Sequence, residues 1–435
     1  MYNSPEMIDP LAVQRWLKRP LRDSARVKTF SRVALDRELA KLSPAPDFVM
    51  RPRDHQLASF LLAAKYDSYA LFHEQGLGKT KIALDVFRYR KKIGQVKTGL
   101  VLVPSSSNVH EWCLECVKHC PEMSTAVLDP SVRGAEDREA LFWGSDTDLV
   151  ICTFRAFLLM VTKMRHGKLE PWQSRLDRGP KRFGMVIADE SLALSNPDAL
   201  LTKLLLRFSR KIPHRMPMTG TPISNDPMGL FTQMKFADGG TTLGKNMAVY
   251  RDAFFRRVQG EYAVSYKLAR GAEPKLHRML RHGSLRYEAR ECLDLPKCTG
   301  GLDAPLVRFV KMTKTMARHA LSWEQSMEDA FRVGDTEERT NIYIRMRKLS
   351  SGYVSTDDGP HYFKEQPKLD AFLQLLSEFD RQMICFLNFK DTADLVIREL
   401  RNKGISHAEI TGRVSNKGAQ MEKFRGGARV LIGSK

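Results

Sequence analysis

The clearest chemical signature in the sequence is the short stretch Gly76-Leu77-Gly78-Lys79-Thr80. Glycines let backbone N–H groups close around phosphate oxygens, and the start of a following helix adds positive potential there. In such a loop Lys79 reaches the β- and γ-phosphates, and the Thr80 hydroxyl binds Mg²⁺. The full pattern has another glycine at the position of His73. A glycine-rich turn beside a surface lysine is the alternative, but a strand before the loop and a helix after it favour phosphate binding.

Two adjacent carboxylates, Asp189-Glu190, follow the apolar run 186–188. This pattern indicates a buried strand whose carboxyl end meets a ligand. Asp189 would hold Mg²⁺ there, and Glu190 would orient and polarise an attacking water. A helix cap is the alternative for such a pair by itself. Its position 110 residues after Lys79, with two α/β passes between, favours catalysis.

A third group, Thr219-Gly220-Thr221, follows Asp189 by 30 residues. Hydroxyls at the end of a strand can link the state of a bound nucleotide to a neighbouring lobe. An ordinary turn would be the better interpretation if this motif stood alone.

Elements that could position these residues are visible from Val49 onward, where short apolar runs alternate with helical patterns. Such alternation indicates a parallel sheet covered by helices on both faces. We expect strands at 69–72, 100–103, 149–154 and 185–188, no strands after about 223, and a second set at 383–389, 408–410 and 430–432.

The predicted fold class is therefore α/β with two parallel-sheet units. We expect a helical lead-in over 1–48, a first unit over 49–300 with a basic helical insertion at about 225–292, and a second unit over 301–435, in which a helical segment, 301–360, precedes a partial α/β core, 361–435.

In this order the motifs resemble those of the Swi/Snf-type branch of the superfamily 2 helicase-like ATPases, from about Arg51 to Lys435. Residues 74–80 resemble motif I, which lacks the first glycine in that branch too. Asp189-Glu190 resembles motif II, and 219–222 with Asn225 resembles motif III. The resemblance implies two RecA-like lobes, ATP and Mg²⁺ as cofactors, and a nucleic-acid partner.

Weaker similarities extend the resemblance. Gln56 is similar to the family glutamine that reads the adenine edge, Leu295-Pro296 resembles the passage to the second lobe, and 384–389 resembles motif IV. Three departures stand against these matches: Leu192 replaces the usual histidine after motif II, Ser195-Asn196 replaces the usual Lys-Asn, and Pro217 lies inside an expected strand.

Residues expected to contact nucleic acid come from two sources. Segment 101–104, with Ser105 after it, resembles motif Ia, where the family contacts phosphates, and Thr153 lies in a match to motif Ib. Arg207, Arg210 and Lys211 belong to a basic run without acidic residues between 201 and 216, which makes them candidate phosphate contacts. A solvated charged face is the alternative. No module for reading bases is visible, so we expect backbone binding with little sequence preference.

Composition supports a polyanionic partner, because 70 Lys and Arg against 50 Asp and Glu give a formal net charge of +20. The seven cysteines indicate reduced thiols, and the run Cys113, Cys116 and Cys120 lacks a second ligand pair at zinc spacing. No signal peptide or membrane span is evident, so we expect a cytoplasmic protein.

We therefore expect an ATP-dependent DNA translocase that tracks the backbone of double-stranded DNA. Two alternatives stay open: an ATP-gated nucleic-acid binding module that hydrolyses weakly or not at all, and an RNA helicase, which residues 219–222 disfavour. Motif VI, whose arginines complete the γ-phosphate site, would lie beyond Lys435, so we expect a truncated sequence.

Overall fold

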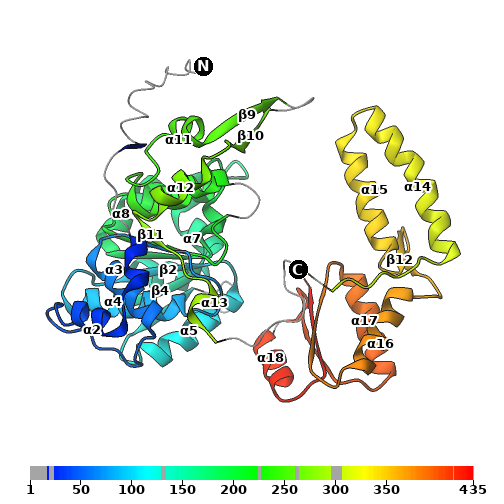
Figure 1. Ribbon diagram of the computed structural model, residues 1–435, viewed down its shortest axis with the longest axis horizontal. Helices are drawn as coiled ribbons and strands as arrows, with labels where there is room; N and C mark the ends of the chain where they lie inside the picture. Colours follow the sequence, from blue (N-terminus) through cyan, green and yellow to red (C-terminus); the bar gives the residue numbers. More distant parts are fainter. Residues whose placement is uncertain are drawn as a thin grey trace. The chain divides into compact units, whose positions relative to one another are not determined.

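The computed structural model describes residues 17–18, 24–128, 134–144, 146–223, 227–259, 264–294, 306–414 and 416–434. The chain divides into two compact units, Met1–Pro296 and Lys297–Lys435 (Figure 1). The sequence matches at Asn225 and Leu295-Pro296 lie outside the described residues. Among the described helices, none has the length and apolar character needed to cross a bilayer.

The first unit alternates strands with helices along the chain. Its elements are η1 (Ser24–Thr29), α2 (Arg32–Leu39), α3 (Asp54–Lys65), β1 (Ala70–Leu71), α4 (Lys79–Lys92), β2 (Gly99–Val103), α5 (Ser106–His119), β3 (Thr125–Leu128), α6 (Ala135–Gly144), β4 (Leu149–Thr153), α7 (Phe154–Val161), β5 (Thr162–Arg165), β6 (Lys168–Pro171), α8 (Gln173–Arg182), β7 (Met185–Asp189), η2 (Ser191–Leu194), α9 (Leu200–Ser209), β8 (His214–Met218), η3 (Pro227–Gly229), α10 (Leu230–Asp238), α11 (Met247–Phe254), β9 (Phe255–Gln259), β10 (Val264–Leu268), α12 (Glu273–Leu280), β11 (Ser284–Leu285) and α13 (Ala289–Cys292).

Seven of these strands form one sheet in the order β11-β1-β8-β7-β2-β4-β3, and every neighbouring pair in it is parallel. The carboxyl ends of all seven strands therefore lie along one edge of the sheet. The predicted α/β class with a parallel sheet is confirmed.

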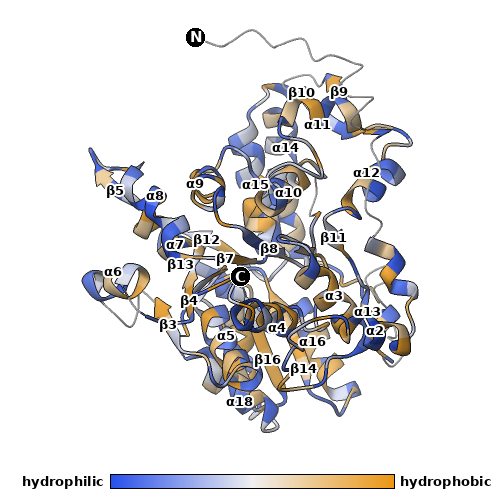
Figure 2. Ribbon diagram, turned by 90° about the vertical axis from the view of Figure 1, so that its left-hand side faces the viewer, coloured by the Kyte–Doolittle hydropathy of each residue, from blue (hydrophilic) through white to orange (hydrophobic). Residues whose placement is uncertain are grey.

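Alternate residues of the central strands enter two separate cores. Val101 and Ile187 pack with α3, α4 and α5 on one face of the sheet, whereas Leu100 and Val186 pack with α6 to α9 on the other. Strands buried on both faces have continuous apolar sequences, which is why 185–188 is recognisable from sequence alone. Figure 2 shows helices such as α5 alternating between hydrophilic and hydrophobic residues, as expected for helices with one face on a core.

Pro217 has no backbone N–H to donate, and in β8 the position of that missing N–H faces the short strand β1 and not β7. The Arg215 carbonyl accepts from the Tyr69 N–H (3.3 Å), and the Thr219 N–H donates to the Leu71 carbonyl (3.1 Å). Since alternate residues face the same neighbour, Pro217 also faces β1. All five residues of β8 pair with β7 on the other side.

Strands continue beyond residue 223, contrary to expectation. Inside the predicted helical insertion, β9 and β10 form an antiparallel hairpin, and β11 pairs with β1 at the edge of the main sheet. The five-residue strand β9 mixes basic and apolar residues, and β11 has two residues, so neither gives a recognisable period. The short strand β3 and the hairpin β5–β6 are likewise not predicted.

The second unit is built on a three-stranded parallel sheet in the order β14-β16-β15. Its three strands lie where the sequence predicts them. The antiparallel hairpin β12–β13 is not predicted, and its first strand lies inside the segment 301–360 that we expect to be helical. Helices α16 and α17 pack on one face of the sheet through Leu376, Val396 and Leu400. The elements of this unit are α14 (Lys314–Arg332), α15 (Thr336–Leu349), β12 (Tyr353–Thr356), β13 (Gly359–Tyr362), α16 (Pro367–Glu378), β14 (Met383–Leu387), α17 (Lys390–Asn402), β15 (His407–Ile410), α18 (Lys417–Arg425) and β16 (Val430–Ser434).

His73, directly after β1, is fully buried and joins the loop that follows to helix α3. Its Nδ1 accepts from the Tyr287 backbone N–H (3.2 Å), so the proton is on Nε2, which donates to the Ser59 hydroxyl (2.8 Å). Ser59 donates to the His55 carbonyl (2.6 Å), and His55 Nε2 donates to the Leu77 carbonyl (3.0 Å). This chain of bonds holds the loop at both ends.

This chain of hydrogen bonds, the His73 relay, requires a neutral His73. A proton on Nδ1 would face the Tyr287 N–H, and burial lowers the pKa of His73 well below its ordinary value of 6.5. The basic groups around it lower the pKa further, and these are His55, Lys79, Lys28 and Arg286.

Replacing His73 tests this protonation state. Because the folded-state pKa is depressed, the unfolded chain takes up the proton first, so this stabilising contribution is complete above pH 6.5 and is lost as the pH falls below it, by about 1 kcal/mol per pH unit. His73→Gln keeps an amide donor and acceptor but cannot titrate. Between pH 7.5 and 5.5, the melting temperature of the wild type should fall further than that of the variant. Parallel curves would show that His73 is not held neutral.

Candidate nucleotide site

The phosphate loop between β1 and α4 has the backbone that its glycines predict. Gly76 and Gly78 have φ values of +79° and +74°, a region that other residues rarely adopt. A Cβ on Gly78 would also come within 2.4 Å of Gln56 Nε2. Gln56 Nε2 in turn donates to the Leu77 carbonyl (3.3 Å). The predicted adenine-reading glutamine therefore lies against the loop.

Lys79 is the first residue of α4, and its ammonium bends back over the loop. Nζ donates to the carbonyls of His73 (3.0 Å) and Glu74 (3.3 Å). Burial lowers the pKa of Lys79, while the carboxylates of Glu190 and Asp189 oppose that shift. The positive charge and the two carboxylates therefore act on one another across the strand ends.

Asp189 ends β7 and is held by two hydrogen bonds. Its Oδ2 accepts from Trp112 Nε1 (2.8 Å), and its Oδ1 accepts from the Glu190 backbone N–H (3.0 Å). Burial raises the pKa of Asp189, and the hydrogen bond from Trp112 works against that rise. Trp112 lies on α5, downstream of the segment 101–104 that resembles motif Ia, and is 2% exposed, so it fixes the carboxylate from a helix packed in the core.

Glu190 and Thr219 join the ends of two neighbouring strands. The Thr219 hydroxyl donates to Glu190 Oε2 (2.8 Å) and accepts from the Thr221 backbone N–H (3.1 Å). Glu190 has a φ of +50°, which is uncommon for a residue other than glycine and costs conformational energy. The hydrogen bond holds the carboxylate in one orientation despite that cost.

Gly220 brings the third motif against the phosphate loop. A Cβ there would lie 3.2 Å from Gln75 Cγ and 3.6 Å from the His73 carbonyl oxygen. The structure thus gathers the three predicted motifs at one edge of the sheet, after β1, β7 and β8.

These residues fit a magnesium nucleotide. The two positive-φ glycines form a cradle open to phosphates, and Thr80, the second residue of α4, carries a hydroxyl directly after the loop. In the part of the chain that the structure describes, no group of three or more His, Cys, Asp or Glu side chains gathers to hold a metal ion. Mg²⁺ held by Thr80 and Asp189 would take its other ligands from phosphate and water, as this ion commonly does.

Two candidate nucleic-acid contacts, Ser105 and Thr153, lie at the same edge and act as helix caps. The Ser105 hydroxyl accepts from the Asn108 N–H at the start of α5, and that of Thr153 accepts from the Ala156 N–H (3.1 Å) at the start of α7. Arg207, by contrast, lies on α9. Their contact with nucleic acid stays a prediction.

The cysteine run on α5 belongs to the core of the first unit. Cys116 and Cys120 are 3% and 1% exposed, and Cys113 packs beside them. A hydrogen bond between Cys116 and Cys120, together with burial, raises the pKa of the Cys116 thiol. His119 bonds to Glu115 on the same helix (3.2 Å).

Several residues that support the site were not predicted. Gln233, fully buried on α10, accepts from the Ser191 hydroxyl (2.9 Å) and donates to the Pro222 carbonyl (2.8 Å), and so joins the segments after β7 and β8. Glu74 begins the segment that resembles motif I, but its hydrogen bond from the Ala289 N–H (2.8 Å) is not visible in the sequence. A single glutamine in an amphipathic helix carries no sequence signal, because its partners are 11 and 42 residues away.

Comparison with known proteins places these motifs in a family. The SNF2-related domain matches residues 54–343. The chain is 23% identical to putative protein p41 of Acyrthosiphon pisum secondary endosymbiont phage 1, over 76% of this chain and 70% of p41. It is also 23% identical to the chromodomain-helicase-DNA-binding protein 1-like of Danio rerio, over 78% of this chain, but spans 32% of that relative's length.

Among solved structures, the chain is similar to the Sulfolobus solfataricus SWI2/SNF2 ATPase core in complex with dsDNA, with 18% identity and a TM-score of 0.44 over 90% of this chain and 80% of that one. The matched domain covers the phosphate loop, both carboxylates and the Thr219 motif, and on that match the chain belongs to the SNF2-related family of helicase-like ATPases.

Proposed function

We propose that this chain hydrolyses ATP with Mg²⁺ and uses the hydrolysis to move along the backbone of double-stranded DNA. The observation that carries the proposal is the convergence of Lys79, Asp189 and the Glu190–Thr219 pair at one edge of a parallel sheet. Membership of the SNF2-related family supports it, as does the Danio rerio relative, which is named for DNA binding.

The residues divide the chemistry among them. Backbone N–H groups of the loop and the Lys79 ammonium bind the β- and γ-phosphates. Thr80 and Asp189 would hold Mg²⁺, and the ion would neutralise charge on the transferred phosphoryl group. Glu190 orients the attacking water. Its carboxylate is suited to that role because the hydrogen bond from Thr219 fixes one of its oxygens.

Movement requires that the state of the nucleotide reach the rest of the unit. The Thr219 hydroxyl bonds both to Glu190 and to the loop at Thr221, and Gln233 bonds the same loop at Pro222. A shift of Glu190 during hydrolysis would therefore be transmitted to the loop and to α10. Networks of this kind carry coupling when they have two discrete arrangements.

A second candidate is an ATP-gated binding module with weak hydrolysis. It is favoured by Leu192, which has no polar side-chain atom at the place where the family usually has histidine. An RNA helicase remains the third candidate, and stimulation by RNA instead of duplex DNA would favour it.

Two single substitutions separate nucleotide binding from hydrolysis. Lys79→Ala removes the charge that meets the phosphates and should abolish ATP turnover. Glu190→Gln should bind a labelled ATP analogue with near wild-type affinity but release phosphate at least 100-fold more slowly, because an amide is a poor general base. Phosphate release and equilibrium binding measure the two effects, with and without duplex DNA. Strong hydrolysis by both variants would refute the assignment of the site.

Thr219 offers a matched test of the link between strands. Thr219→Val removes the hydroxyl that positions Glu190 but keeps the shape of the side chain, and should lower kcat by about 10- to 100-fold with little change in KM for ATP. Thr219→Ser retains the hydroxyl and should keep most of the activity. Equal kcat values for the two variants would mean that this hydrogen bond does not position the carboxylate.

A further inference from the structure

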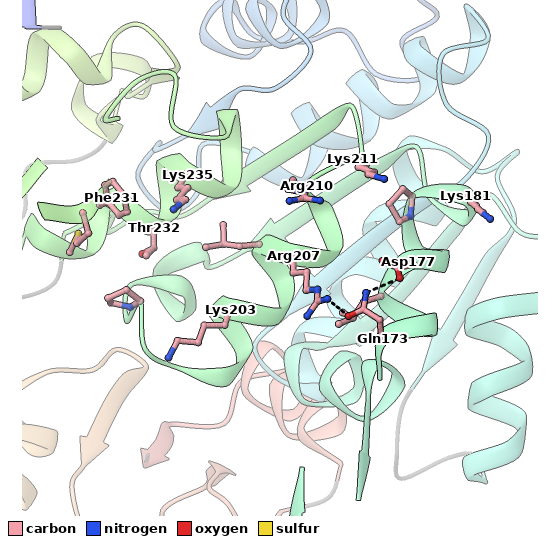
Figure 3. A pocket seen from close by; sticks show the side chains of 15 residues that line it. Gln173, Asp177, Lys181, Lys203, Arg207, Arg210, Lys211, Phe231, Thr232 and Lys235 are labelled. Atoms are coloured by element: carbon pink, nitrogen blue, oxygen red, sulfur yellow. Dashed lines mark hydrogen bonds between the residues drawn. The ribbon is translucent and has the colours of Figure 1, made fainter. Parts of the chain in front are cut away.

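A basic groove runs along the outer surface of α8, α9 and α10 in the first unit. It has a volume of about 990 Å³ and 15 lining residues, of which one, Asp177, is acidic. Six are basic, and Figure 3 shows them around the groove: Lys181, Lys203, Arg207, Arg210, Lys211 and Lys235. Four of these belong to the basic run between 201 and 216, and the fold adds Lys181 from α8 and Lys235 from α10.

The groove is distinct from the nucleotide edge. Helix α9 begins after β7, at the carboxyl edge of the sheet, and returns to the start of β8, at the opposite edge. Lys203 therefore lies nearer the nucleotide site, and Arg210 and Lys211, which follow the last residue of the helix, lie near the far edge. Ligand contacts along this surface would not be contacts of the motifs at the carboxyl edge.

Within the part of the chain that the structure describes, Lys203 is the one of these six basic residues that forms an ion pair with a carboxylate. The Arg207 guanidinium donates to the Gln173 amide, and Lys235 Nζ donates to the Lys245 carbonyl (3.0 Å), so the described partners of both are neutral. Lys203 pairs with Asp198 (3.3 Å), but both side chains are more than half exposed, where such a pair contributes little.

The spacing and the walls indicate what kind of polyanion fits. Lys203 and Arg207 are four residues apart on α9, which places them on one side of the helix about 6 Å apart, and Arg210 and Lys211 follow directly after its last residue. The one aromatic residue of the lining, Phe231, is buried, so the groove offers no exposed ring on which a base could stack. A chain of phosphates held in a duplex matches these features better than unpaired bases do.

We infer that this groove binds the phosphate backbone of duplex nucleic acid, at a place separate from the motif-bearing edge. The inference rests on the proposed function, because it takes nucleic acid as the partner. Helix α10 connects the two places: Phe231, Thr232 and Lys235 line the groove, and Gln233 on the same helix bonds the loop after β8.

A triple variant of the full chain, Lys203→Gln with Arg207→Gln and Lys211→Gln, tests the groove. The matched control removes three exposed lysines of the first unit outside the groove, Lys41→Gln with Lys97→Gln and Lys118→Gln, each of which pairs with an acidic residue. Both variants lose three positive charges. Their melting temperatures report whether each remains folded.

The measurement is the affinity for a 30-base-pair duplex DNA at several salt concentrations. The groove variant should bind about 10- to 100-fold more weakly at 0.1 M salt, and its log–log salt slope should be less steep by about 3, because each lost phosphate contact reduces the slope by about 0.9. The control should stay within threefold of the wild type.

Two results would overturn the account at different levels. If the wild type binds duplex DNA and the groove variant matches the control in affinity and slope, the groove assignment fails while the proposed function stands. If the wild type has no measurable affinity for duplex DNA, the proposed function itself fails.

Discussion

The parallel direction of β1, β8 and β7 is the constraint on which the rest of the site depends. Parallel strands present all their carboxyl ends at one edge, so the phosphate loop, the two carboxylates and the Thr219 motif meet although they are spread over some 140 residues of chain. An antiparallel neighbour would send one of these segments to the opposite edge. The full burial of the strands on both faces fixes their register, because a slip would expose apolar side chains on one core and leave gaps in the other.

Hydrogen bonds then fix the orientation of the side chains and the loop that meet at this edge. Trp112 holds Asp189, Thr219 holds Glu190, and the neutral relay through His73 holds the phosphate loop. Trp112 lies on α5, whereas Thr219 and His73 lie just after β8 and β1, and all three side chains are buried. Preorganised polar groups of this kind are usually the largest source of catalytic stabilisation.

Sequence reasoning recovers the parts of this site that have a short-range pattern. The glycine loop, the carboxylate pair after an apolar run and the Thr219 motif each occupy a few consecutive residues, and strands such as 100–103 show as continuous apolar runs. The hydrogen bond between Tyr287 and His73 joins positions 214 residues apart, and no sequence pattern near either residue indicates the contact. Short strands such as β11 cannot be predicted either, since two residues are too few to show the alternation of apolar and polar side chains that marks a strand.

The basic residues likewise are partly predictable from the sequence and partly not. Their excess is visible in the composition, but the groove exists only because α8 and α10 bring Lys181 and Lys235 beside the run on α9.

If the edge of the sheet is the site of a magnesium-dependent ATPase, duplex DNA should stimulate it. The experiment is single-turnover ATP hydrolysis by the wild-type chain with duplex DNA, single-stranded DNA or RNA in turn. We expect the largest acceleration with duplex DNA and the loss of that acceleration when Mg²⁺ is chelated. Equal rates with and without duplex DNA, or a preference for RNA, would contradict the proposed function.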